Sequence, residues 1–246
     1  MISRSVTGVP VLASLLSLPG RAGLDLGLGL SYSSNFWTRS GPYSYFDEDN
    51  GSPSPGFRLG FPTVQEVFFD AQVGVNARVL ITPSGRRVEL RQVGTSNVYE
   101  SADSSYLQLI GGGDNLTIYS SDGTQMSYVK RQDEWRCSQI EDRNGNLIIV
   151  NNNDQGDITS IADTLGRVIT FNYDGNANLI SITQNWAGQP QPHTWATFGW
   201  GNIPIQSNLP GVVGTHSGDV IPMLTQVGLD DALTTRLNTT PTAKST

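Results

Sequence analysis

Apolar and polar residues alternate along much of this chain in short runs that are separated by turn residues. The clearest run spans residues 24–33, where Leu or Tyr occupies every second position and Asp, Gly or Ser stands between them. A period of two residues is the side-chain period of a β-strand. We therefore expect a strand with one buried leucine face and one glycine face that packs closely against a neighbour. Pro19-Gly20 predicts a turn just before this strand.

Further short strands follow at the spacing of an antiparallel meander. The apolar runs predict strands at 64–71, 75–82, 87–92, 97–100, 106–110, 116–120 and 125–129, and later ones at 194–200 and 223–229. Segment 35–62 differs, because Gly, Pro and Asp clusters interrupt a series of aromatic residues. We expect it to be a loop packed down on the sheet. The whole pattern predicts an all-β fold, an antiparallel meander of hairpin repeats that forms a curved, open sheet.

The stretch 142–183 repeats itself at an offset of 21 residues, and self-similarity at a fixed period indicates a repeat protein. Each unit has the outline of a β-hairpin, with two turns rich in Gly, Asn and Asp and two β-rich runs. The matched pairs are Asp142 with Asp163, Gly145 with Gly166, Val150 with Phe171, Asn153 with Asp174, Ile158 with Leu179, and Ile161 with Ile182. Residues 122–140 resemble a degenerate earlier unit in which Cys137 takes the place of Ile158, so about three units are present.

Composition narrows the classes of function. Only 15% of the 246 residues are charged and the formal net charge is −7. No basic stripe is available to neutralise phosphate groups, which argues against nucleic acid and against anionic membrane surfaces as partners. No apolar run approaches the roughly 20 residues of a membrane-spanning helix. The apolar run 9–18 is short and contains Pro10, so we expect no secretory signal within this chain.

Candidate catalytic groups are few. The chain has two histidines, His193 and His216, and one cysteine, Cys137. No Gly-x-Ser-x-Gly motif accompanies them, and sequence alone brings no pair of carboxylates together, so we predict that the protein is not an enzyme. The set is also too small for a structural zinc site. Residues 151–157 are rich in oxygen ligands, but Ala162 stands where a calcium loop requires Glu, so we predict a turn and neither metal nor cofactor.

Residues 184–231 are rich in Trp and Pro and interrupt the repeat. Trp186, Trp195 and Trp200 allow two interpretations, a platform that stacks on sugar rings or the packed core of an insertion. The aromatic residues of 35–61 are a second feature in favour of sugar binding.

The repeat resembles the RHS-repeat, or YD-repeat, family. The residues that carry the resemblance are Gly166, Arg167, Phe171, Tyr173, Asp174, Leu179 and Ile182, with Asp142, Gly145, Asn146, Ile158 and Ile161 in the preceding unit. The similarity covers roughly 120–183, and segments 18–33 and 56–62 resemble the lead that precedes such repeats. Two features depart from the family pattern: Asn152-Asn153 stands where a Tyr-Asp pair is expected, and Ala177 replaces a turn glycine.

Such a resemblance implies a sheet that spirals into a hollow shell, or cocoon, which encloses a C-terminal toxic or effector domain in bacterial members. In animal teneurin relatives the fold serves adhesion. The chain would then be a non-enzymatic scaffold, a fragment of the shell whose partners are the rest of that shell and the enclosed effector. The alternative is a cell-surface adhesion or carbohydrate-binding module with glycan partners. Either role implies an extracellular or cell-surface location.

On this basis the chain divides into a lead region (1–120), a repeat region (121–183), a Trp/Pro-rich insertion with a strand (184–231) and a disordered tail (232–246). Permissible codon choices allow the tail to be read in a neighbouring frame that restores the aromatic rhythm of the repeat. We therefore hypothesise that the reading frame slips near Ala232 and that the chain is a fragment of a longer repeat protein.

Overall fold

A computed structural model describes residues 11–33, 37–40, 42–47, 50–70, 75–207, 209, 211–214, 217–229, 234–236 and 242–243. Most of these residues lie in β-strands, and the helical segment among them is a single 3-10 turn, η1 (Arg21–Gly23). The predicted all-β fold is confirmed. Within the described ranges, no helix is long and apolar enough to cross a membrane.

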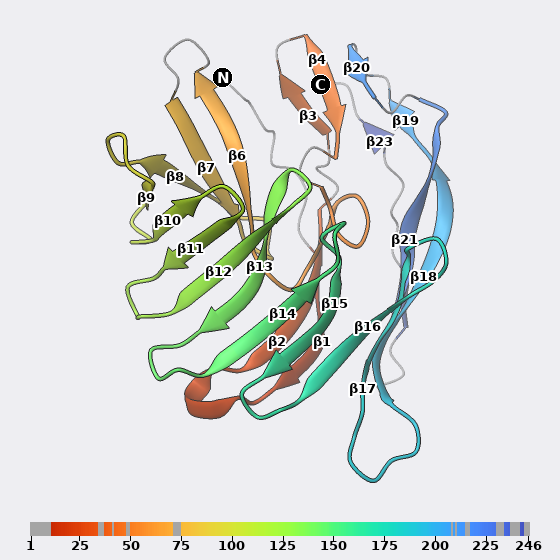
Figure 1. The fold of residues 1–246 in the computed structure, drawn as a ribbon. Coiled ribbons are helices and arrows are strands. Elements are labelled where there is room, and N and C mark those ends of the chain that lie inside the picture. The colour runs from red at the N-terminus through yellow and green to blue at the C-terminus, as the bar shows by residue number, and fades with distance from the viewer. Residues whose placement is uncertain are drawn as a thin grey trace.

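Eight consecutive strands close into an antiparallel barrel (Figure 1). They are β6 (Thr63–Asp70), β7 (Val75–Ile81), β8 (Arg87–Gln92), β9 (Val98–Ser101), β10 (Gln108–Gly112), β11 (Asn115–Tyr119), β12 (Gln125–Arg131) and β13 (Glu134–Glu141). β13 pairs with β12 on one side and, through its first residues, with β6 on the other. Closure of the barrel gives hydrogen-bond partners to backbone N–H and C=O groups that would be unpaired at the edges of an open sheet. The expectation of a wholly open sheet is therefore not confirmed for this part of the chain.

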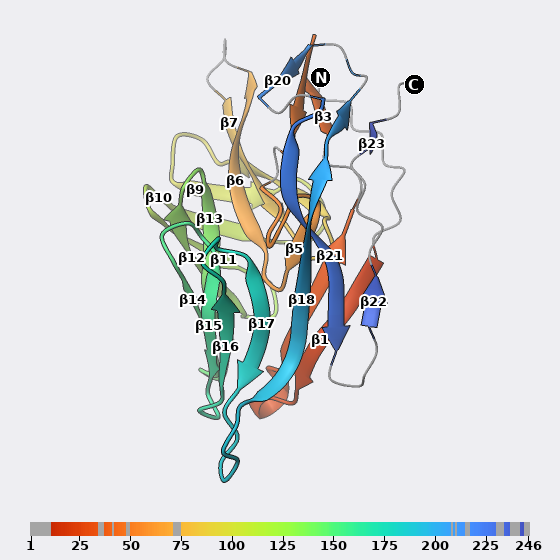
Figure 2. The same ribbon diagram turned by 90° about the vertical axis from the view of Figure 1, so that its right-hand side faces the viewer.

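β13 is shared between the barrel and a curved extension of the same sheet. Glu134–Arg136 pairs with β6, whereas Gln139–Glu141 pairs with the next strand along the chain. The extension, seen in Figures 1 and 2, consists of β14 (Leu147–Asn152), β15 (Ile158–Asp163), β16 (Val168–Tyr173), β17 (Leu179–Gln184), β18 (His193–Pro204), β21 (Val220–Leu229) and β22 (Thr234–Arg236). Barrel and extension together form one sheet of 15 strands in the described residues.

A small sheet of β1 (Val11–Leu18), β2 (Leu26–Tyr32) and β5 (Phe57–Leu59) packs on the extension and lies behind β14–β16 in Figure 1. The predicted leucine face is confirmed, because Leu26, Leu28 and Leu30 are buried in one cluster with apolar residues of β14–β18. The expected close-packed glycine face is wrong at Gly27. That residue is exposed, and no atom lies within 4 Å of the position that a Cβ would take.

The barrel has a hydrophobic core of its own. The core residues point inward from all eight strands and are Val64, Leu80, Val88, Leu90, Tyr99, Leu109, Leu116, Ile118, Tyr128, Trp135 and Cys137. The first seven of these strands were predicted within a few residues of their ends, because turn residues delimit them. β13 covers the closing half of the degenerate repeat unit that was predicted at residues 122–140. The sequence pattern did not indicate which strands pair to close the ring.

Segment 35–62, predicted as a loop, contains β3 (Trp37–Ser40) and β4 (Tyr43–Phe46) as well as β5. These strands are only three or four residues long, and their breaker-rich surroundings conceal them from a pattern analysis. Short β20 (Val212–Val213) adds to β4, and β19 (Gln206–Ser207) pairs with β23 (Thr242–Ala243).

The predicted strands at 194–200 and 223–229 are confirmed as parts of β18 and β21. These two long strands pair with each other and β18 also pairs with β17, so this part of the chain continues the main sheet. In the tail, residues 234–236 and 242–243 form β22 and β23, and the other residues of 232–246 lie outside the described ranges.

Candidate functional site

The polar residues of the repeat motif build its turns. Asp142 and Asp163 each accept hydrogen bonds from the backbone N–H groups two and four positions further on, at 2.8–3.0 Å. Asp174 does the same at the opposite end of the second hairpin, at 2.8 and 2.9 Å. Gly145 and Gly166 occupy the left-handed position of these turns, with φ of 78° and 75°. This is the geometry of a type I turn followed by a bulge residue, which favours glycine there.

Arg167 links its turn to the lead region. Its guanidinium donates to the Asp163 carboxylate through Nε and Nη2, at 2.8 and 2.5 Å. Nη2 also donates to the backbone oxygen of Pro19 at 2.9 Å. Arg167, one of the residues that carry the resemblance, therefore ties the second repeat to the turn before β2.

The apolar residues of the repeat motif all face one core. Ile158, Ile161, Phe171, Leu179 and Ile182 are buried in a single cluster, and Tyr173 packs against it. The offset of 21 residues seen in the sequence is thus also the period of burial, since Ile158 and Leu179 occupy matching places on β15 and β17.

A second periodic feature was not predicted. Register shifts occur at Asn151/Asn152, Asn172/Tyr173 and Gly199/Trp200, and the residue after each shift sends its side chain back to the preceding unit. Asn152 Nδ2 donates to the Cys137 oxygen at 3.0 Å, Tyr173 Oη to the Ile158 oxygen at 2.8 Å, and Trp200 Nε1 to the Leu179 oxygen at 2.8 Å. We call these three hydrogen bonds the bulge ties.

The bulge ties have a common physical reason. Pairing between adjacent units begins only at Gln139, Ser160 and Ser181, two residues after each acceptor. A carbonyl group that lies before this point has no ladder partner in the next unit, and a buried backbone oxygen needs a donor. The Asn152 amide, the Tyr173 hydroxyl and the Trp200 indole N–H each supply this donor. Asn152, a departure from the family pattern, thus performs the role that Tyr173 has in the next unit.

The ties also show where the repeat continues. Trp200 lies opposite Leu224 in β21, as Tyr173 lies opposite Leu179. The hairpin of β18 and β21 is therefore a further structural unit, although its connecting segment 205–219 is far longer than a repeat turn. The sequence predicted both strands and an insertion between them, but the sequence pattern did not reveal that the two strands pair with each other.

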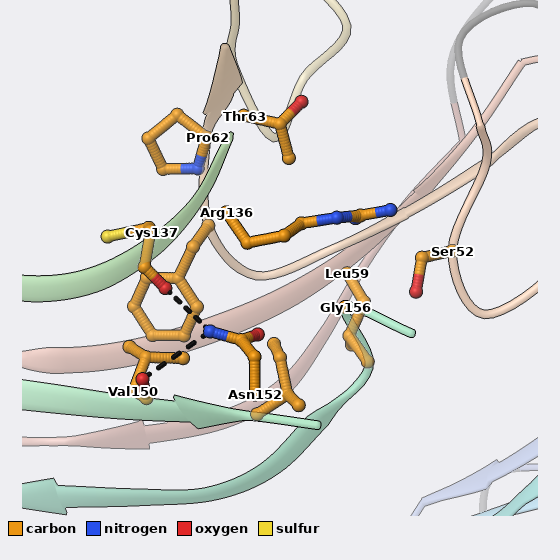
Figure 3. A pocket seen from close by; sticks show the side chains of 11 residues that line it. Ser52, Leu59, Pro62, Thr63, Arg136, Cys137, Val150, Asn152 and Gly156 are labelled. Carbon is orange, nitrogen blue, oxygen red and sulfur yellow. Dashed lines mark hydrogen bonds between the residues drawn. The ribbon is translucent and has the colours of Figure 1, made fainter. Parts of the chain in front are cut away.

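A small cavity lies where the extension leaves the barrel (Figure 3). Its described lining includes Ser52, Thr63, Arg136, Cys137 and Asn152. Figure 3 shows the Asn152 side chain bonded to the Cys137 and Val150 oxygens, at 3.0 and 3.4 Å. The cavity has a volume of about 20 Å³ and could hold roughly one ordered water molecule. Neither a histidine nor a carboxylate is among the described residues that line it.

An ion pair lies beside this cavity. Glu134, almost fully buried, forms an ion pair with Arg136 Nη2 and accepts a hydrogen bond from Gln65 at 3.4 Å. Burial raises the pKa of the Glu134 carboxyl, and the positive charge of Arg136 opposes that shift. A buried ion pair is costly to break because one charge then stays unpaired. The pair therefore fixes the start of β13, where the sheet divides.

Cys137 has no reactive character. Its thiol is buried, and desolvation raises the thiol pKa to about 12. A thiol with so high a pKa carries almost no thiolate at neutral pH. The position of Cys137 in the core agrees with its alignment with Ile158 in the repeat, where an apolar residue is expected.

Arg78 was also missed, because it occupies one position of an otherwise ordinary strand. It is 5% exposed, and its guanidinium carbon lies 4.4 Å from the Tyr99 ring centre and 5.1 Å from that of Trp135. Nη1 donates to the Gly111 oxygen at 3.1 Å, and Trp135 Nε1 donates to the Gly113 oxygen at 3.0 Å. The glycine-rich turn thus closes one end of the barrel over a cation held between aromatic rings.

Two of the three predicted sugar-stacking residues lie together. Trp186 stacks on His193, with ring centres 3.9 Å apart and an interplanar angle of 15°, and Trp195 meets both rings edge to face. Both indole N–H groups donate to Gln184 Oε1, at 3.1 and 3.2 Å. We call Gln184, Trp186, His193 and Trp195 the aromatic corner. Trp200 does not belong to it, because its indole is bonded to the Leu179 oxygen.

The remaining candidates have other surroundings. Asn153 and Asp157 of the rejected calcium loop bond to each other within a turn, at 2.9 and 3.2 Å. Within the described ranges, no group of three or more His, Cys, Asp or Glu side chains is placed to hold a metal ion. His216 lies outside the described residues.

Comparison of the sequence with models of protein families found no match, and comparison with curated proteins found none either.

Proposed function

We propose that this chain is a non-enzymatic scaffold, part of a β-shell of the RHS or YD-repeat type that encloses an effector or toxin domain in the complete protein. The observation that carries the proposal is the succession of equivalent units from β14 to β21, each with a bulge and a bulge tie to the unit before it. A sheet whose units are joined by the same bonds extends by adding further units. The expected location is extracellular or at the cell surface.

The chemistry of the repeat supports a scaffold. The Asp142, Asp163 and Asp174 carboxylates all accept hydrogen bonds within their own turns, and no substrate is needed to explain them. The outward row across β14, β15 and β16 holds Asn151, Ser160 and Thr170, whose small polar side chains suit a wet surface.

Electron microscopy of the complete gene product tests this proposal. The flanking DNA is sequenced on both sides, and the protein encoded by the whole locus is purified and imaged. The expected result is a hollow particle with many further hairpin units and density inside it. Limited proteolysis should cut the enclosed domain only after the shell has been denatured. A gene product that consists of these 246 residues alone and sediments as a stable monomer would contradict the proposal.

A second candidate function is a cell-surface adhesion or carbohydrate-binding module. The observation that favours it is the aromatic corner, where Trp186 is 44% exposed although its ring is held by three neighbours. Exposed, well-held aromatic residues are typical of binding sites. A glycan array probed with the intact chain tests this function, and absence of binding to every glycan would exclude it.

A further inference from the structure

The aromatic corner is rigid before any ligand arrives. Gln184 is 6% exposed, and one oxygen of its amide accepts both indole N–H groups, which fixes the direction of the two rings. His193 covers one side of Trp186 in a parallel stack. These contacts cover one face of the Trp186 ring and its N–H group, and the residue as a whole is still 44% exposed. A binding surface that is already ordered loses little entropy on association.

The loop that carries this ring is polar and has no charged residue. Residues 185–192, which connect β17 to β18, are all exposed and read Asn-Trp-Ala-Gly-Gln-Pro-Gln-Pro. The connection projects from the lower end of the sheet in Figure 1. Asn185, Gln189 and Gln191 offer amide groups that both donate and accept hydrogen bonds. No charged side chain occurs in this loop.

An apolar ring face beside neutral amides is complementary to one class of ligand. A hexopyranose has a face of C–H groups that lies flat on an aromatic ring and a rim of hydroxyl groups that pair with amides. An acidic sugar would lose hydration without gaining a cation. A protein partner would need a contact area of roughly 800 Å² on each side, with an apolar centre. In this loop, however, Trp186 is the one large apolar residue.

We propose that Trp186 is the stacking residue of a site for neutral hexopyranose units, with hydroxyl groups of the sugar held by the amides of the 185–192 loop. Gln184 and Trp195 act as positioning residues that hold the indole in place. The proposal rests on the second candidate function, carbohydrate binding, and gives that function a site and a ligand class. It does not depend on the shell proposal.

Titration of the intact chain with neutral oligosaccharides of the gluco, manno and galacto series tests the site. Binding is followed by calorimetry and by the change in tryptophan fluorescence. We expect at least one series to bind, and Trp186→Ala to weaken its binding by about tenfold or more. Trp186→Phe keeps a smaller aromatic ring, so its affinity should lie between that of the unchanged chain and that of Trp186→Ala. Tyr106→Ala removes an aromatic residue that is 76% exposed outside the corner and should leave binding unchanged.

The outcomes separate the site from the function. Binding that is unchanged in Trp186→Ala would overturn the site and leave carbohydrate binding in place elsewhere on the chain. A preference for acidic oligosaccharides would overturn the ligand class. Failure of every neutral series at about 10 mM would overturn the proposed site, and failure of the glycan array as well would exclude the second function with it. Thermal unfolding of each variant confirms that a lost signal reflects the site and not the fold.

Discussion

Gly156 lies against the side chain of Arg136, so closely that a Cβ added to Gly156 would stand 3.1 Å from Arg136 Nε. Gly156 belongs to the turn after β14, and Arg136 belongs to the strand that joins the barrel to the extension. A glycine is therefore favoured here for two reasons: its φ is 91°, and the Arg136 side chain occupies the space that a Cβ would need. Gly156 therefore contributes to the contact between the repeat turn after β14 and the barrel strand β13.

Gly156→Ala should destabilise the protein more than Gly166→Ala does. Both residues have positive φ, but no atom lies within 4 Å of a Cβ at Gly166. The backbone term should cost each variant about 1 kcal/mol. The Arg136 side chain must also shift to make room for the Cβ, which should strain its ion pair with Glu134 and cost Gly156→Ala up to about 1 kcal/mol more. Urea unfolding measures both variants, and equal losses of stability would show that Arg136 moves aside freely.

Tyr173→Phe should lower the unfolding free energy by about 1 kcal/mol, because it removes the donor to the Ile158 oxygen and leaves the ring in place. Tyr106→Phe is the matched control, since Tyr106 is 76% exposed. Its stability should not change. If the two variants unfold alike, the bulge ties do not contribute to stability in the way that their geometry indicates.

Acid should weaken the repeat through Asp142. Hydrogen bonds from the Asn146 side chain, and further ones from Asn144 and the backbone, lower the pKa of the Asp142 carboxyl from 3.8 to about 2. A lowered pKa in the folded state means that the ionised form stabilises the fold. That contribution is complete above the unfolded pKa and is lost as pH falls from about 4 to about 2. Carbon-13 NMR titration of this carboxyl measures the pKa, and titration near 3.8 would contradict the turn geometry.

Cys137 should resist alkylation at neutral pH. Desolvation raises the pKa of its thiol to about 12, and the barrel core shields the sulfur. Iodoacetamide should therefore label the chain only after unfolding in urea. Since the chain contains one cysteine, intact-mass spectrometry reports this reaction without ambiguity. Full labelling of the native protein within the same time would show that the junction opens.

Features with a local cause could be predicted from the sequence. The turn at Asp142 forms from hydrogen bonds within five residues, so its Asp and Gly are visible as a motif. The alternation in 24–33 identifies the buried face of β2 in the same way. The aromatic corner was half predictable. Trp186 and Trp195 are near neighbours along the chain and do meet, whereas Trp200 is directed to the Leu179 oxygen by a bulge that has no sequence signal.

The sequence by itself determined the all-β class, the repeat of 21 residues, the turns and the faces of the strands, because these depend on periodicities and on bonds between residues close in the chain. The tertiary structure alone decided which strands are neighbours. The closure of β6 on β13 joins residues about 70 positions apart, and β18 pairs with β21 across a long connection. Such pairings depend on which arrangement of the whole chain lets the strand edges form hydrogen bonds and buries the apolar faces at the same time. No local sequence pattern contains that information.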